Sequence, residues 1–171
     1  MRQYLPALML IAATQAHAAA PLSPPDAEEY EVGAKAWVEQ EVTPPAYPKA
    51  SGLVELRTGS LSANRFLIDA DTLSIGKDGV VRYTLVVRSS AGVENASFEG
   101  IRCATREQKS YAFGQRSGSW SPALEPQWRR IEAREVNRHH AVLFTDIICT
   151  NGATPPRAVR DVVQRLRYGR L

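Results

Sequence analysis

DGVVRYTLVVRSSAGVENASFEGIRC, residues 78–103, is the stretch of this 171-residue chain that decides the fold. Over residues 80–88 apolar side chains alternate with a partly charged set, and this period of two is typical of a strand with two different faces. Residues 89–92 have the composition of a turn, and a second extended run follows up to Cys103. The stretch therefore predicts a long antiparallel hairpin at the centre of the fold.

Shorter strands and two helices are predicted around this hairpin. The strands lie at residues 53–57, 65–69, 72–75 and 109–115, with a return through Trp120. The helices are expected at residues 137–149 and after Thr154. In the last helix the apolar side chains recur with the spacing of one buried face, at Val159, Val162, Val163 and Leu166. Strands followed by helices indicate the α+β class, with an antiparallel sheet of about five to six strands packed by C-terminal helices.

The N-terminus predicts export. A basic start, an apolar run over residues 5–13 and the sequence Ala16-His17-Ala18 form the three parts of a secretory signal peptide. The apolar run is far shorter than the roughly 20 residues that span a bilayer. We therefore expect cleavage after Ala18 and a mature chain without a transmembrane segment. No cysteine lies near that site, so the protein is expected in the periplasm and not as a lipoprotein.

Composition divides the chain into three segments. Residues 1–18 are the signal peptide, residues 19–50 a Pro- and acid-rich leader and arm, and residues 51–171 one folded domain. Within the arm, residues 30–42 have a weak helical pattern, whereas the prolines of residues 43–48 require an extended backbone. We expect the arm to lie across the domain, with Trp37 or Tyr47 in an apolar groove.

The two cysteines, Cys103 and Cys149, predict a disulfide, because an exported chain matures in an oxidising compartment. Closing a loop of this size would stabilise the fold by roughly 4 kcal/mol. Two separate buried thiols are the alternative. Two cysteines so far apart predict no metal site. Adjacent His139 and His140 also predict none, because they face different sides of a helix without a further ligand at metal spacing.

Basic residues are concentrated at the C-terminal end, although the formal net charge is only +3. Residues 101–171 hold 13 basic and 6 acidic side chains, against 2 and 6 in residues 19–50. A basic third of this kind is either a solvated face or a surface for an anionic lipid or glycan. The predicted export argues against nucleic acid as a partner.

A run of short motifs carries a family resemblance: Ile68-Asp69, Ser74-Ile75-Gly76, residues 78–83, Arg88-Ser89, Gly92, Asn95 and residues 98–103. The run continues with Tyr111-Ala112, Trp120, Trp128 and Cys149. Through these motifs the chain resembles the CNP-like family of exported proteins from the proteobacterial envelope, over about residues 37–165. The resemblance implies an envelope location. It implies no activity, because no function is established for the family.

Four charged residues of the central hairpin form the first candidate site: Arg82, Arg88, Glu99 and Arg102. If the two strands pair, Arg82 or Arg88 is expected near Glu99. Such a pair is either structural, worth about 0.2–1 kcal/mol, or part of a cluster that binds an anionic ligand through guanidinium forks. Four aromatic residues likewise predict either core packing or a groove for a glycan or peptide: Tyr111, Phe113, Trp120 and Trp128.

Asp69 and Asp71 are the remaining candidate binding residues. Their segment lacks the ligand spacing of an EF-hand, so we expect an Asp-rich turn whose carboxylates bond nearby amides. With Glu99 they are the central carboxylates available to a hydrolase, which would need two of them at a defined separation. The chain has no nucleophile elbow, zinc-protease motif or phosphate-binding loop, and no cofactor is predicted.

The sequence thus favours a periplasmic module that binds an envelope protein or an anionic component of the envelope. A carboxylate-dependent hydrolase acting on envelope material is the alternative. The oligomeric state is left open.

Overall fold

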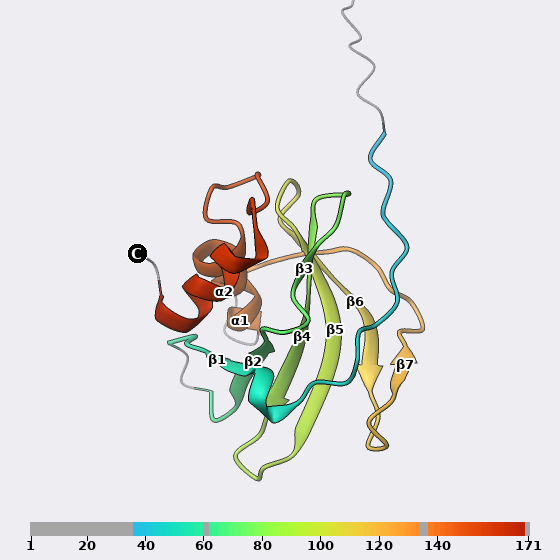
Figure 1. Ribbon diagram of the computed structural model, residues 1–171, viewed down its shortest axis with the longest axis vertical. Coiled ribbons are helices and arrows are strands. Elements are labelled where there is room, and N and C mark those ends of the chain that lie inside the picture. Colours follow the sequence, from blue (N-terminus) through green and yellow to red (C-terminus); the bar gives the residue numbers. More distant parts are fainter. Residues whose placement is uncertain (1–35, 60–61, 134–136, 170–171) are drawn as a thin grey trace, which may run out of the picture. The chain divides into compact units, whose positions relative to one another are not determined.

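An antiparallel sheet organises the protein in its computed structural model, which describes residues 36–59, 62–133 and 137–169 (Figure 1). The predicted signal peptide, its cleavage after Ala18 and the leader up to residue 35 lie outside the described residues. From Trp37 onward the chain forms one compact unit.

The described residues form eight strands. They are β1 (Leu53–Leu56), β2 (Arg65–Asp69), β3 (Ser74–Ile75), β4 (Val80–Arg88), β5 (Glu94–Arg102), β6 (Glu107–Gly114), β7 (Trp120–Pro122) and β8 (Arg129–Arg130). Their order is β1-β2-β4-β5-β6-β7, with β3 paired to β4 and β8 paired to β6. The described sheet has two or three more strands than the five to six predicted. Strand β8 lies where no strand was predicted, because two residues are too few to show an alternating pattern.

The predicted central hairpin is confirmed. Strands β4 and β5 pair without interruption from Val80 opposite Arg102 to Arg88 opposite Glu94. Between them the chain turns at Gly92, whose φ of 79° lies in the left-handed region that glycine adopts without strain.

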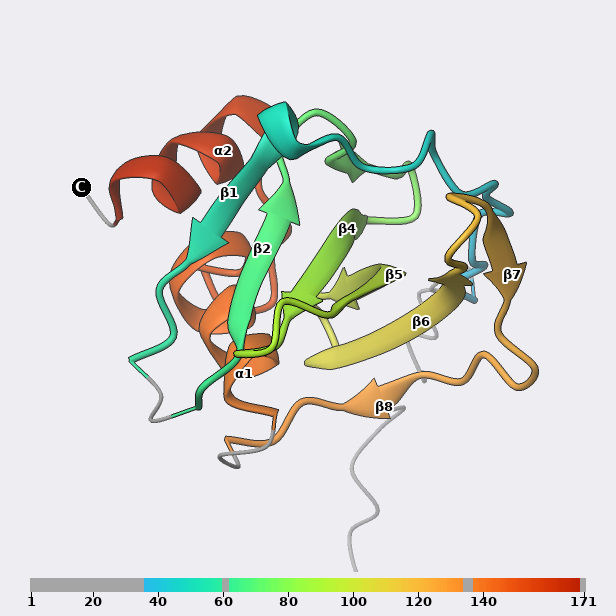
Figure 2. The same ribbon diagram turned by 90° about the horizontal axis from the view of Figure 1, so that it is seen from below.

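Two short helices near the C-terminus cover one face of the sheet. Helix α1 (Arg138–Val142) continues into the π-helical segment η3 (Leu143–Ile148), and α2 (Val159–Tyr168) follows. Figures 1 and 2 show α1 and α2 on the side of the sheet next to β1 and β2. The fold is thus mostly β with a little helix.

Both faces of β4 are buried, for different reasons. Val81, Tyr83 and Leu85 point into the main core, which the helices close with Leu143 and other apolar side chains. We call this side the helix face. Arg82, Thr84 and Val86 alternate with them and are also buried, on the side that we call the arm face. The partly charged set of the sequence pattern therefore does not face water.

An extended arm, residues 37–48, crosses the arm face. The expected helix over residues 30–42 is wrong for its described part, because residues 36–42 form no helix. The proline run that begins at Pro44 disfavours helix in the residues before it. The backbone groups of Gln40 bond to side chains of the sheet instead. In both views the arm passes beside β7, and the Trp120 Nε1–H of β7 donates to the Pro45 carbonyl at 2.8 Å.

Candidate functional site

Arg82 and Asp78 form a buried ion pair on the arm face. The guanidinium donates from Nη1 to Asp78 Oδ1 at 3.1 Å and from Nη2 to Oδ2 at 2.6 Å, and both side chains are 2 % exposed. Burial raises the pKa of Asp78, but hydrogen bonds from Arg82 and from the amides of Gln40 and Val80 outweigh it and hold that pKa below its ordinary value. Two charge-assisted bonds in one plane thus fix the turn that precedes β4.

Gly76 leaves the space that this pair needs. A Cβ at Gly76 would lie 2.2 Å from Asp78 Oδ1 and 2.4 Å from Arg82 Nη1. A larger residue would push the charged groups apart in a site that excludes water. The Ser-Ile-Gly motif at residues 74–76 therefore has a steric explanation.

The arm closes the ion pair from above. The backbone N–H of Gln40 donates to Asp78 Oδ2 at 2.9 Å, and the backbone carbonyl of Gln40 accepts from Arg82 Nη2 at 3.2 Å. Trp37 Nε1–H donates to the Asp78 carbonyl at 2.8 Å, while the Trp37 ring lies 3.8 Å from the Arg102 guanidinium. Two of the four candidate residues of the hairpin, Arg82 and Arg102, thus hold the protein's own arm.

A second anchor of the arm is Glu39. It accepts hydrogen bonds from Lys109 Nζ at 2.8 Å, Tyr111 OH at 2.9 Å and Trp128 Nε1 at 3.2 Å. Burial raises the pKa of Glu39, but these three donors outweigh it and lower that pKa below its ordinary value. An open groove of about 570 Å³ runs along residues 39–43, yet its Glu39 and Lys109 already neutralise each other.

The aromatic residues serve mainly to receive the arm. Trp128 meets the Trp37 ring edge-on at 6.0 Å, and Trp120 packs against Tyr47 at 5.3 Å. Phe113 remains exposed. The expectation that Trp37 or Tyr47 packs on the domain is confirmed. The sequence left open whether these aromatic residues form core or a binding groove. Trp120 and Trp128 form a groove, and the arm of the same chain occupies it.

Glu99 lies on the helix face in a network of hydrogen bonds. Its Oε2 accepts from Tyr83 OH at 2.9 Å and from His140 Nε2 at 2.8 Å, and its Oε1 accepts from Ser97 Oγ at 2.6 Å. Burial raises the pKa of Glu99, but these donors outweigh it and keep that pKa below its ordinary value. The carboxylate stands between serine and histidine, so the histidine cannot take the serine proton as a general base would.

His139 lies beside this network and stacks on Phe66, with ring centroids 4.4 Å apart. Burial, with the charge of His140 next to it, lowers the pKa of His139 to about 4. Among the described residues its buried Nδ1 has no hydrogen-bond partner. His139 therefore stays neutral at physiological pH and packs as a flat ring.

The expected approach of Arg82 or Arg88 to Glu99 does not occur. Successive residues of a strand face opposite sides, and Glu99 pairs in register with Tyr83 on the helix face. Arg82 lies on the other side. Arg88 instead donates from Nε to Glu94 at 2.7 Å, at the exposed end of the hairpin. The four candidate residues therefore do not form one ligand cluster.

Asp69 and Asp71 form the expected Asp-rich turn, in which Asp69 Oδ1 accepts from the Asp71 amide at 3.1 Å. Ile68 belongs to the core on the helix face, so its neighbour Asp69 lies on the arm face. Asp69 and Glu99 are thus separated by the sheet. They cannot flank one scissile bond as a hydrolase with paired carboxylates requires.

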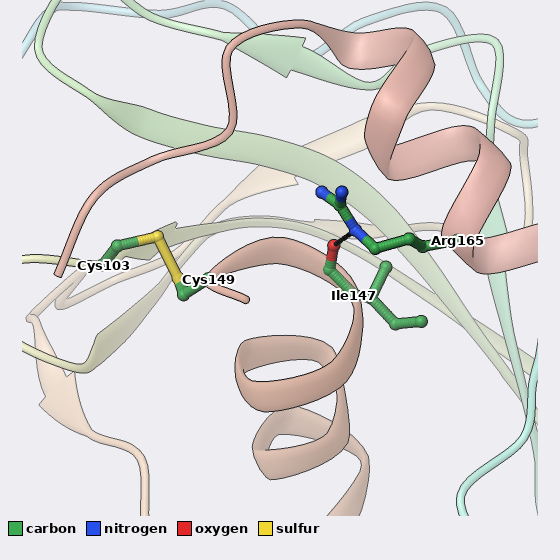
Figure 3. Close-up of a disulfide and its surroundings, with 4 residues drawn as sticks. All are labelled: Cys103, Ile147, Cys149 and Arg165. Carbon is green, nitrogen blue, oxygen red and sulfur yellow. Dashed lines mark hydrogen bonds between the residues drawn. A yellow bond between two sulfur atoms is a disulfide. The ribbon is translucent and has the colours of Figure 1, made fainter. Parts of the chain in front are cut away.

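The predicted disulfide between Cys103 and Cys149 is present (Figure 3). It joins the residue after β5 to the residue after η3, and so connects the sheet to the helical layer. Close by, Arg165 of α2 donates from Nε to the Ile147 carbonyl at 2.7 Å.

Sequence reasoning missed a basic pocket at the C-terminal end of α2. It has a volume of about 400 Å³ and is lined by Leu56, Arg57, Val142, Asp146, Ile147, Arg165, Leu166, Arg167 and Gly169. Its three arginines come from segments more than 100 residues apart, so no local motif announces them. Only the excess of basic residues in the last third pointed in this direction.

The described residues also bear on metal binding and on membrane spans. No group of three or more His, Cys, Asp or Glu is placed there to hold a metal ion. Within the same residues, every helix is too short or too polar to cross a bilayer.

The family model described as the CNP1-like family matches residues 32–167. No curated protein and no solved structure matches the chain.

Proposed function

The chain belongs to the CNP1-like family, and from the placement of its arginines we propose that it is an envelope module that binds an anionic lipid surface. It acts by binding and not by catalysis. The observation that carries the proposal is the contrast between two sets of arginines. On the central hairpin, Arg82 and Arg102 hold the protein's own arm and Arg88 pairs with Glu94. Around α2 most of the arginines are exposed, namely Arg57, Arg157, Arg160 and Arg167.

The exposed set lies along α2 and the end of β1. Within the described part of the chain, no carboxylate lies within 4 Å of the guanidinium groups of Arg57, Arg157 and Arg167, and Arg160 has only the 3.7 Å contact with Asp161. We call Arg57, Arg157, Arg160, Arg165 and Arg167 the basic surface. Each lysine or arginine near an anionic membrane contributes about 1 kcal/mol to binding.

Tyr168 favours a lipid over a glycan as the partner. It stands at the end of α2 beside Arg167 and is 75 % exposed. A tyrosine of this kind suits the interface between lipid head groups and acyl chains.

The proposed location is the periplasm, after cleavage of the signal peptide near Ala18. The Cys103–Cys149 disulfide supports it, because such bonds persist in oxidising compartments. Mass spectrometry of the protein recovered from the periplasmic fraction should give an N-terminus at or near Ala19. A chain that stays in the cytoplasm with Met1 or Arg2 at its N-terminus would contradict export.

Vesicle sedimentation tests the binding. The chain from Ala19 should sediment with vesicles that contain phosphatidylglycerol, should stay in solution with pure phosphatidylcholine, and should be released by high salt. Arg157→Glu/Arg160→Glu should weaken the binding about 30-fold or more, since two favourable charges are lost.

The matched control is Arg129→Glu/Arg130→Glu, which makes the same change of net charge at two exposed residues of β8. It should bind nearly as well as the wild type. An equal loss of vesicle binding in both double variants would show that only the net charge matters, and would refute the basic surface as the binding site. Binding to isolated peptidoglycan but not to anionic vesicles would overturn the lipid as partner.

A further inference from the structure

The basic pocket combines two chemical environments. Its floor consists of apolar side chains from three elements, Leu56 of β1, Ile147 of η3 and Leu166 of α2, with Val142 beside them. Its rim carries Arg57, Arg165 and Arg167 against one carboxylate, Asp146. The pocket therefore has an apolar interior and an excess of positive charge at its mouth.

These features fit one kind of ligand. A volume of about 400 Å³ lies within the usual range of small-molecule sites, roughly 300–1,000 Å³. An anionic head group can accept paired hydrogen bonds from guanidinium forks, while an alkyl chain gains by leaving water for the floor. A fully polar anion would leave the floor unused, and a neutral hydrocarbon would leave the arginines without a partner.

Arg165 is held ready for such a head group. Its Nε donates to the Ile147 carbonyl at 2.7 Å. In Figure 3 the two terminal nitrogens of the guanidinium take no part in that bond. Fixing a donor before the ligand arrives lowers the entropy lost on binding. The C-terminal end of α2 carries a partial negative charge, which stabilises the arginines there. The same partial charge repels an anionic ligand, so the attraction of the arginines must exceed that repulsion.

We propose that this pocket binds one single-chain anionic amphiphile, with its phosphate or carboxylate on Arg57, Arg165 and Arg167 and its alkyl chain on the apolar floor. The inference deepens the proposed function and rests on it. The basic surface brings the protein to an anionic membrane, and the pocket takes a single acyl chain from it.

Calorimetry with dodecyl phosphate, kept below its micelle concentration, tests the pocket on the chain from Ala19. Dodecyl phosphate should bind at one site. Inorganic phosphate, which has the head group alone, should bind at least 100-fold more weakly. Dodecyltrimethylammonium, which has the same chain with a positive head group, should not bind. Equal binding of the cationic and anionic amphiphiles would overturn the proposal.

Two pocket variants locate the site. Arg57→Glu removes one exposed fork, and the loss of a charge-assisted hydrogen bond should weaken dodecyl phosphate binding at least tenfold. Val142→Phe fills part of the pocket and should weaken it by a similar factor. Arg129→Glu, at an exposed residue of β8 outside the basic surface and the pocket, is the charge-matched control and should stay within about twofold. Unchanged affinity in both pocket variants would place the ligand elsewhere and overturn the proposal.

The two proposals fail in different experiments. If anionic vesicles bind the wild type but dodecyl phosphate does not, the pocket is refuted and the membrane-binding function stands. If dodecyl phosphate binds with the expected loss in Arg57→Glu while anionic vesicles do not bind, the pocket stands as a site for a free amphiphile and the membrane surface is refuted.

Discussion

Among single residues, Arg82 makes the most demanding contact, because its charge is buried together with that of Asp78. Removing one partner of such a pair leaves the other charge buried and uncompensated. Arg82→Met should therefore lower the free energy of unfolding by about 3–5 kcal/mol, as measured by urea unfolding. The same variant frees the Gln40 carbonyl and should raise hydrogen exchange in the arm.

Arg88→Met is the matched control on the same strand. Its partner is Glu94, and the two side chains are 32 % and 48 % exposed. A surface pair contributes about 0–1 kcal/mol, so this variant should be nearly neutral. Similar losses in the two variants would show that burial does not set the energy of the Arg82 pair.

His139 makes the stability depend on pH. Its pKa in the folded protein is about 4, against an ordinary value of 6.5. The unfolded chain therefore takes up this proton at a higher pH than the folded protein does, and the free energy of unfolding falls as the pH drops from 6.5 towards 4. Between pH 7 and pH 5 the loss from this group is about 2 kcal/mol.

Urea unfolding at both pH values checks this for the wild type and for His139→Phe, which keeps the stacking on Phe66 and has no titrating ring. Glu99 and His140, which lie nearest, are present in both proteins, so the difference reports His139. A variant that loses as much stability as the wild type would rule out the histidine as the source.

Among the elements, α2 is the one whose packing can be tested most directly. Val162 and Leu166 are buried against the core, and Val159 and Val163 pack at its edge, as the helical spacing predicts. Val162→Asp buries a charge and should cost about 3 kcal/mol or more in a thermal or urea melt. Gln164→Asp, on the exposed side, should change stability by less than about 0.5 kcal/mol.

The long central hairpin was predictable from sequence, whereas the shortest outer strand was not. The nine residues of β4 alternate over enough positions to identify a strand. The turn composition of residues 89–92 and the extended run after it then identify β5 as its partner. Strand β8 has only two residues, which contain no pattern, and no strand was predicted there. The arm has a weak helical pattern over residues 30–42, but the conformation of residues 36–42 is set by partners far along the chain, such as Arg82 of β4 and Lys109 of β6.

The sequence identified charged residues that make specific interactions, but it did not identify their partners. Arg82, Glu99 and Arg102 do have defined interactions, but sequence could not say that Arg82 would meet Asp78 or that Glu99 would meet His140, 41 residues away. A pairing of that kind depends on which face of the sheet each residue occupies and on what covers that face. The basic pocket was not predicted for the same reason, because its lining comes from elements that are far apart in the sequence.

At the scale of the whole molecule, the disulfide connects the two layers. It closes a loop with a sequence separation of 46, which in the chain-entropy model stabilises the fold by about 4 kcal/mol. Cys103→Ala/Cys149→Ala should lower the free energy of unfolding by about that amount. Reductant should lower the melting temperature of the wild type and leave the double variant unchanged. Equal wild-type melts with and without reductant would contradict the contribution of the bond.

The arm also has a consequence for the order of events during synthesis. Glu39 leaves the ribosome 89 residues before its partner Trp128, a delay of roughly 4–18 s at the usual rate of translation. Until then Glu39 lacks one of its three hydrogen-bond donors and the Trp37 ring lacks its edge-on contact with Trp128. The arm is made early, yet it can dock only after its partners, and closing so long a loop delays its contacts further. A nascent chain stopped just before Trp128 would therefore hold the start of its arm less firmly than the full chain does, and a protease should cleave the arm more readily there.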